Sequence, residues 1–146
     1  MRPVVIAVAI LFGTVAFAEE YGWDPASFDV SGYHVLKFRA SVGGMTPAQR
    51  RLILEFRMPK VLTQVQYKQE VVVTTKRAPR GERQIFVNDV YFLTVTRQEA
   101  KACNSTVPTL AKQWAARIKT AFERVGPARQ LPHTGAAKPV PEKHLD

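Results

Sequence analysis

The stretch from Gln84 to Val125 constrains the fold more than any other part of the chain. Two short runs of β-branched and aromatic residues, 85–87 and 90–95, flank the pair Asn88-Asp89, which suits a two-residue hairpin turn. Beyond them, apolar residues recur at steps of three and four, which predicts one buried stripe along a helix. That stripe comprises Val107, Leu110, Ala111, Trp114, Ile118, Ala121, Phe122 and Val125.

The amino end decides the expected compartment. Arg2 precedes an apolar run over 4–15, and Ala16-Phe17-Ala18 has the A-x-A form of a cleavage site. The run is shorter than the roughly 20 residues of a membrane-spanning helix. We therefore expect a signal peptide over 1–18, cleaved after Ala18, and a secreted or periplasmic protein without a transmembrane span. A membrane anchor formed by an uncleaved signal is the alternative.

The remaining chain is expected to form one domain. The full sequence of 146 residues is 46% hydrophobic and 10% aromatic, which is enough for a core. We expect an extended lead-in over 19–29, a single domain over 30–125 and a disordered proline-rich tail over 126–146. Cys103 is the only cysteine, so no disulfide forms within the chain, and we expect a buried or half-buried structural thiol there.

The first half of the domain shows a strand and a capped helix. Alternation over 33–39 predicts a strand whose His34, Leu36 and Phe38 face inward. Thr46 can cap a helix, with Pro47 at its first position and Gln49 completing a capping box. We expect Pro59 to end this helix. Its expected core residues are Ala48, Leu52, Ile53 and Phe56, and its expected outward residues are Arg50, Arg51, Glu55 and Arg57.

The middle of the chain predicts a hairpin with a basic tip. Alternation over 66–75 indicates a strand, and the proline and glycine within 76–83 break it. A second capping box over 96–99 predicts a short helical turn before the long helix, which should begin near Thr106.

Residues 30–39 and 87–96 repeat one pattern: a turn, an apolar strand and then a capped helix. We therefore expect an α+β fold of two strand-plus-helix halves that share one sheet of about four strands. The order is β-α-β-β-β-α, with both main helices on one face of the sheet.

The segments Phe86–Ala100 and Leu110–Lys119 carry a family resemblance. They resemble an uncharacterised exported α+β module of bacterial envelope proteins, and they are similar to the soluble segment ahead of some small-conductance mechanosensitive channels. The resemblance covers about 30–125 and includes the first helix start. It implies no catalytic residues, and without the channel's transmembrane segments it implies no channel activity.

Two groups of basic residues are candidate sites for an anion or an anionic surface. The first is the hairpin tip, which could bind lipid phosphates or a wall polymer; the alternative is a solvated turn. It contains Lys76, Arg77, Arg80 and Arg83. The second is the glycine-preceded helix start with Arg50 and Arg51, whose alternative is an ordinary capped helix.

No catalytic or metal-ligand constellation has a diagnostic spacing. His34 is the only histidine within 30–125, and the acidic residues form no close pair in the sequence. We expect no metal and no cofactor. The net charge of +9 favours anionic partners, although export makes nucleic acid an unexpected one.

We therefore expect a non-enzymatic exported envelope protein that binds an envelope protein or an anionic membrane or wall surface. The alternative is a small hydrolase or ligand-binding protein with a pocket between sheet and helices. The sequence indicates no oligomeric state.

Overall fold

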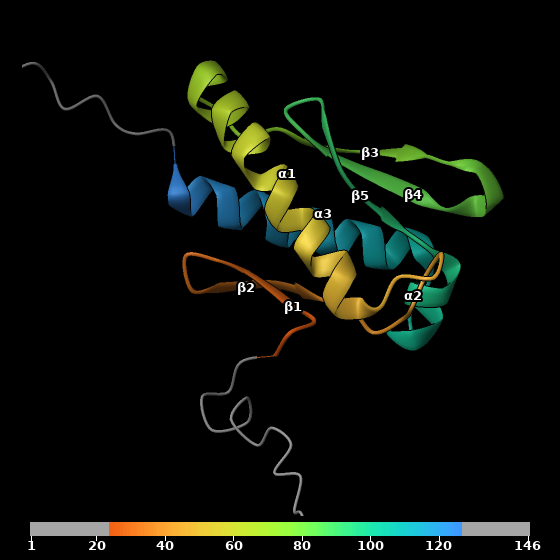
Figure 1. Cartoon of the computed structure of the whole chain (residues 1–146). Helices are drawn as coiled ribbons and strands as arrows, with labels where there is room; N and C mark the ends of the chain where they lie inside the picture. The colour runs from red at the N-terminus through yellow and green to blue at the C-terminus, as the bar shows by residue number, and fades with distance from the viewer. Residues whose placement is uncertain (1–23, 127–146) are drawn as a thin grey trace, which may run out of the picture.

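The computed structural model describes residues 24–126 as an α+β fold (Figure 1). The predicted signal peptide, residues 19–23 of the predicted lead-in and residues 127–146 of the predicted tail lie outside this range. The elements in chain order are β1 (Ser27–Val30), β2 (Tyr33–Lys37), α1 (Pro47–Lys68), β3 (Val73–Arg77), the 3-10 turn Pro79–Gly81, β4 (Arg83–Val87), β5 (Val90–Val95), α2 (Arg97–Ala102) and α3 (Val107–Val125).

The strands form two antiparallel sheets, so the expectation of one shared sheet is wrong. β1 pairs with β2, while β3, β4 and β5 form a three-stranded sheet in that order. Residues 27–30, which we placed in the lead-in, supply β1. Because β2 finds this partner across a two-residue turn, it pairs within its own half and not with the strands of the other half.

The two hairpins β1–β2 and β4–β5 are built alike. Both turn pairs, Ser31-Gly32 and Asn88-Asp89, have positive φ at both residues, as a type I′ turn requires. The register shifts after Phe28 in one hairpin and after Ile85 in the other, two residues before each turn. The predicted turn at Asn88-Asp89 is confirmed. The internal repeat also includes the register shift, which falls at equivalent positions of the two hairpins.

The prediction for the inward face of β2 is wrong in part. Leu36 and Phe38 are buried, but His34 is exposed and Val35 is fully buried. Successive side chains of a strand point to opposite faces, so the burial of both Val35 and Leu36 means that both faces of β2 are covered there. β5 repeats this pattern with Phe92 and Leu93.

Helix α3 follows the prediction closely. It begins after the N-cap Thr106, and every residue of the predicted stripe except Val125 is buried. Two of its rings make edge-to-face contacts, Trp114 with Phe38, which follows β2 directly, and Phe122 with Phe92 of β5. Burying each such large side chain contributes about 1.5–3 kcal/mol, so this helix is the main apolar bridge between the two sheets.

Helix α1 begins as predicted but ends later. Thr46 and Gln49 form the capping box, and the helix passes through Pro59 to Lys68, where Gln69 adopts a left-handed cap. A proline inside a helix removes one backbone hydrogen bond. Here the helix continues because Val61 and Val65, beyond the proline, are fully buried. Residues 66–68 are therefore helical, and the strand predicted over 66–75 is observed as β3, which starts at Val73 and ends at Arg77.

The predicted core face of α1 is also wrong. Its buried residues are Arg50, Leu54, Val61 and Val65, whereas Leu52 and Phe56 are exposed. At about 3.6 residues per turn, the predicted positions centre on nearly the opposite side of the helix from the real core stripe. A buried arginine among the core positions hid the true stripe from the pattern.

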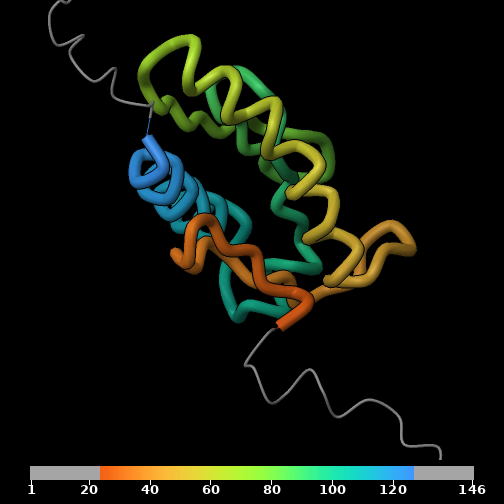
Figure 2. Tube along the Cα trace, turned by 60° about the vertical axis from the view of Figure 1, so that its left-hand side comes forward, coloured from red at the N-terminus to blue at the C-terminus, as the bar shows by residue number. Residues whose placement is uncertain are grey.

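The helices cross-connect the two hairpins (Figures 1 and 2). α1 contacts β1 of its own half and β5 of the other, while α3 contacts β4 of its own half and β2 of the other, together with β3. The short helix α2 packs on α3. The two halves are therefore interlocked and share one core.

Candidate functional site

Arg50, a predicted anion-binding residue, is buried and already paired. Its Nη1 atom donates to the carboxylate of Glu99 and to the backbone oxygen of Ala40, 2.7 Å away. Its guanidinium lies over the Phe38 ring, 4.1 Å from the centroid. We expected Arg50 to face water or a partner; the structure instead uses its charge to compensate a buried carboxylate.

Glu99 joins this cluster from α2 and is fully buried. Besides Arg50, it accepts hydrogen bonds from the backbone N–H groups of Arg39 at 2.7 Å and Ala40 at 3.3 Å. Only one of the two hydrogen bonds of the second predicted capping box is therefore formed. Thr96 caps α2, but the Glu99 side chain turns away from the cap into the core. The sequence pattern at Glu99 indicated a helix start, but it did not indicate that this carboxylate is buried and paired with Arg50.

Arg51 does not form an open anion site with Arg50. Its side chain is largely buried and pairs with Glu55 one turn along the helix. At the helix start, Thr46 and Gln49 bind each other's backbone N–H groups. The ordinary capped-helix interpretation explains this region.

The basic hairpin tip lies between β3 and β4, as predicted. Arg77 and Arg83 are paired directly across the two strands, and both line a hollow of about 300 Å³ with Pro108 of α3. Arg97 approaches from α2: a Cβ at Gly81 would lie 3.0 Å from its Nη2 atom. The structure thus adds Arg97, which the sequence pattern did not single out, to the tip.

The other two predicted tip residues are exposed. Lys76 places its Nζ atom over the Phe86 ring, 4.5 Å from the centroid. Arg80 stands at the apex in a left-handed conformation with φ of 63°. Within residues 24–126, no carboxylate forms an ion pair with Arg77, Arg80, Arg83 or Arg97. Glu82 lines the hollow and is the only acidic side chain that does so.

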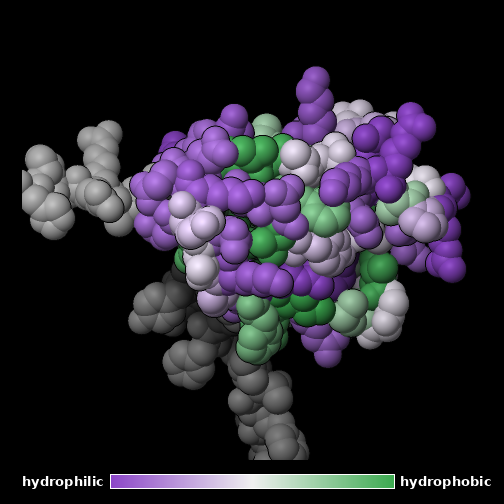
Figure 3. Space-filling view, turned by 90° about the horizontal axis from the view of Figure 1, so that it is seen from above, coloured by the Kyte–Doolittle hydropathy of each residue, from purple (hydrophilic) through white to green (hydrophobic). Residues whose placement is uncertain are grey.

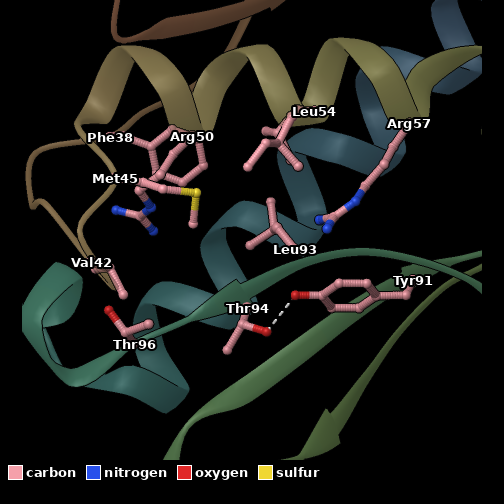
Figure 4. A pocket seen from close by; sticks show the side chains of 11 residues that line it. Phe38, Val42, Met45, Arg50, Leu54, Arg57, Tyr91, Leu93, Thr94 and Thr96 are labelled. Carbon is pink, nitrogen blue, oxygen red and sulfur yellow. Dashed lines mark hydrogen bonds between the residues drawn. The ribbon is translucent and has the colours of Figure 1, made fainter.

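A pocket of about 130 Å³ lies between α1, the 38–45 connection and β5 (Figure 4). Leu54 of α1 and Leu93 of β5 face one another across it, with Arg50 and Arg57 to either side. The Nη1 atom of Arg57 donates to the backbone oxygen of Phe92 at 2.6 Å. The residues that line the pocket are Phe38, Val42, Met45, Arg50, Ile53, Leu54, Arg57, Tyr91, Leu93, Thr94 and Thr96.

The polar groups of this pocket are mostly engaged with one another. The Tyr91 and Thr94 hydroxyls are 2.7 Å apart, and the Arg57 guanidinium lies 4.5 Å from the centroid of the Tyr91 ring. The sequence did not point to Arg57 or Tyr91 as a pair, since 34 positions separate them and only the packing of α1 on β5 joins them.

Cys103 is half-buried, as expected for a structural thiol. Burial, together with the nearby Glu99 carboxylate, raises the pKa of this thiol above its ordinary value. The thiolate is the nucleophilic form, so the environment of Cys103 opposes nucleophilic chemistry.

The described part of the chain contains no cluster of three or more His, Cys, Asp or Glu residues that could hold a metal ion. His34 pairs with Asp29 on the surface, 2.9 Å away. No helix between residues 24 and 126 is long and apolar enough to span a membrane.

A protein-family model matches most of the described chain. The model described as "Domain of unknown function (DUF8459)" matches residues 27–125. The chain belongs to this family. The match begins at the first residue of β1 and ends at the last residue of α3, so the DUF8459 domain comprises both hairpin-plus-helix halves. No curated protein and no solved structure matches the chain.

Proposed function

We propose that this DUF8459 protein is a non-enzymatic exported module of the cell envelope that binds an anionic surface through its basic hairpin tip. Secretion into the periplasm or beyond rests on the pattern of residues 1–18. The resemblance of residues 30–125 to an exported envelope module supports the same compartment.

The cross-strand pair Arg77 and Arg83 carries this proposal. Like charges directly opposite one another destabilise a pair of strands. Glu82 is the only acidic side chain that lines this hollow and it forms no ion pair with either arginine, while Arg97 adds a third guanidinium nearby. A phosphate or carboxylate of a lipid or polymer would relieve this repulsion, and each basic side chain at an anionic membrane adds about 1 kcal/mol of binding.

Several other basic residues are already paired with carboxylates. Arg50 is neutralised by Glu99 in the core, and Lys68 is paired with Asp89. Hydrophilic side chains cover much of the face seen in Figure 3, with apolar residues in separate patches between them. At the tip, by contrast, Lys76, Arg77, Arg80 and Arg83 lie within eight residues of chain, and no carboxylate between residues 24 and 126 forms an ion pair with any of them.

Co-sedimentation of the full chain with vesicles tests this proposal. We expect binding to vesicles that contain an anionic phospholipid, no binding to neutral vesicles, and steep weakening as salt rises. The double charge reversal Arg77→Glu/Arg80→Glu should abolish binding. The matched reversal Lys112→Glu/Arg117→Glu, on the exposed face of α3, changes the net charge equally and should retain most of it. Indifference to salt, or equal loss in both variants, would remove the proposal.

A further inference from the structure

We propose that the pocket between α1 and β5 binds a small carboxylate whose apolar body is about the size of a benzene ring. This site is separate from the basic tip, and the two share no lining residue. The pocket lies between a sheet and a helix, as the alternative hypothesis of a ligand-binding protein requires, and the proposal specifies the chemistry of its ligand.

The size of the pocket limits its occupant. Its volume of about 130 Å³ is close to the roughly 150 Å³ of an apolar protein cavity that admits benzene. It is well below the roughly 300 Å³ at which pockets for drug-sized ligands begin. The walls around this space are mainly apolar, and one of the lining residues, Met45, is exposed.

The other half of the molecule shows how this space would be filled if it had only a structural role. Trp114 stands eight residues after the N-cap of α3, and Leu54 stands eight residues after the N-cap of α1. Trp114 is buried with its ring against Phe38. Where α3 places an indole ring, α1 places only a leucine, and the pocket lies beside that leucine.

Arg57 gives the site its preference for an anion. Its guanidinium has five N–H donors, and one of them reaches the Phe92 oxygen. Arg57 is half-buried and forms no ion pair with any residue from 24 to 126, and no carboxylate lines the pocket. Arg50, the other lining arginine, is neutralised by Glu99. A carboxylate that reaches Arg57 from an apolar body in the pocket would gain a charge-assisted hydrogen bond.

Titration of the full chain with 3-phenylpropanoate, followed by NMR shifts of the backbone amides, tests the site. We expect saturable shifts at residues of α1 and β5, and binding of the neutral 3-phenylpropanamide at least about tenfold weaker, as loss of a charged hydrogen-bond partner implies. Arg57→Gln should weaken the acid about tenfold and leave the amide unchanged. Arg77→Gln/Arg83→Gln at the tip should change neither.

The variant Leu54→Trp provides a second test that keeps the fold. It places in α1 the tryptophan that α3 carries at the equivalent position, and it should abolish binding of 3-phenylpropanoate. The NMR spectrum of the backbone N–H groups should remain that of a folded protein. The proposal is overturned if the wild-type chain binds neither probe, if acid and amide bind equally, or if the acid binds Leu54→Trp as tightly as the wild type.

The same chemistry is found in free arylalkyl acids and at the C-terminus of a peptide that ends in phenylalanine. A tetrapeptide ending in phenylalanine, compared with its C-terminal amide, separates these sources. Tighter binding of the peptide acid than of 3-phenylpropanoate would identify a protein C-terminus as the ligand, and weaker binding would identify a free acid.

Discussion

The two halves of this domain share a local plan and differ in several places, three of which coincide with unusual sites. Each half has a hairpin with a type I′ turn and a bulge at the equivalent position, followed by a threonine-capped helix with a proline in its first turn. Only the second half has a third strand, β3, and with it the basic tip. In the helix cores, Arg50 stands where α3 has Leu110, and Leu54 stands where α3 has Trp114. The shared features explain the fold, and these three differences coincide with the tip, the buried ion pair and the pocket.

The outer faces of the two helices differ as well. Positions four apart on α1 carry Leu52 and Phe56, and Phe56 is 83% exposed. The corresponding positions of α3 carry Lys112 and Ala116. α3 is thus an ordinary solvated helix on its outer side, whereas α1 exposes large apolar side chains.

The largest effect should come from making α1 resemble α3 at its buried arginine. Arg50→Leu would leave Glu99 buried without its cationic partner, which typically costs about 3–5 kcal/mol of the free energy of unfolding. Urea denaturation measures this cost. Arg50→Leu/Glu99→Gln should recover more than half of it, since glutamine still accepts from the backbone of Arg39. Lys119→Gln, which breaks an exposed pair with Glu123, should cost below about 0.5 kcal/mol. If Arg50→Leu lowers the free energy of unfolding by less than about 1 kcal/mol, the buried ion pair is not needed for stability.

Exchanging the equivalent core residues of the two helices should give an asymmetric result. Trp114→Leu removes a buried ring and should cost about 3 kcal/mol in the same measurement. Leu54→Trp adds volume beside an existing pocket and should cost less than about 1.5 kcal/mol. If both exchanges cost the same, the two positions are packed alike and the space beside Leu54 is not available to a larger side chain.

The two hairpin turns should respond oppositely to glycine. The Asn88 side chain accepts from the Val72 N–H at 2.7 Å and donates to the Glu70 oxygen at 2.8 Å. Asn88→Gly keeps the positive φ but loses both bonds, and we expect a loss of about 1–2 kcal/mol. Ser31 has a positive φ of 48° and is exposed, so Ser31→Gly should be neutral or stabilising by up to about 1 kcal/mol. Thermal unfolding of the two variants would contradict this difference if both shifted in the same direction by similar amounts.

The smallest effect should come from the outer face of α1. Phe56→Ser and Tyr67→Ser replace side chains that are 83% exposed, and each should change the stability by less than about 0.5 kcal/mol. Phe122→Ser, at a fully buried position of α3, is the contrasting control and should cost about 3–5 kcal/mol. A loss of 2 kcal/mol or more at Phe56, on the same scale, would mean that this face is covered in the folded protein.

The second half could be predicted from the sequence because its signals are local. The turn at Asn88-Asp89, the α3 stripe and the short α2 all rest on residues within a few positions of one another. β1 was missed although Phe28 and Val30 alternate like Ile85 and Val87 in the equivalent strand. Extending the internal repeat by three residues toward the N-terminus would have found it.

The first helix and the sites could not be predicted in the same way. Arg50 is buried because Glu99, 49 positions away, compensates it, and no local pattern indicates that pairing. With Arg50 read as polar surface, the apolar outer residues Leu52 and Phe56 took the place of the core. The basic tip was visible as a charge run, but its cross-strand arginine pair depends on the register of β3 and β4.

The measurement that tests the proposed function most directly is the partition coefficient of the full chain on anionic vesicles after neutralising the cross-strand pair. Arg77→Gln/Arg83→Gln should lower it about 30-fold, as two basic contacts of about 1 kcal/mol each imply. Lys112→Gln/Arg117→Gln, with the same net charge, should lower it less than about threefold, because screening weakens distant charges. Equal losses for the two variants would contradict a binding site at the tip.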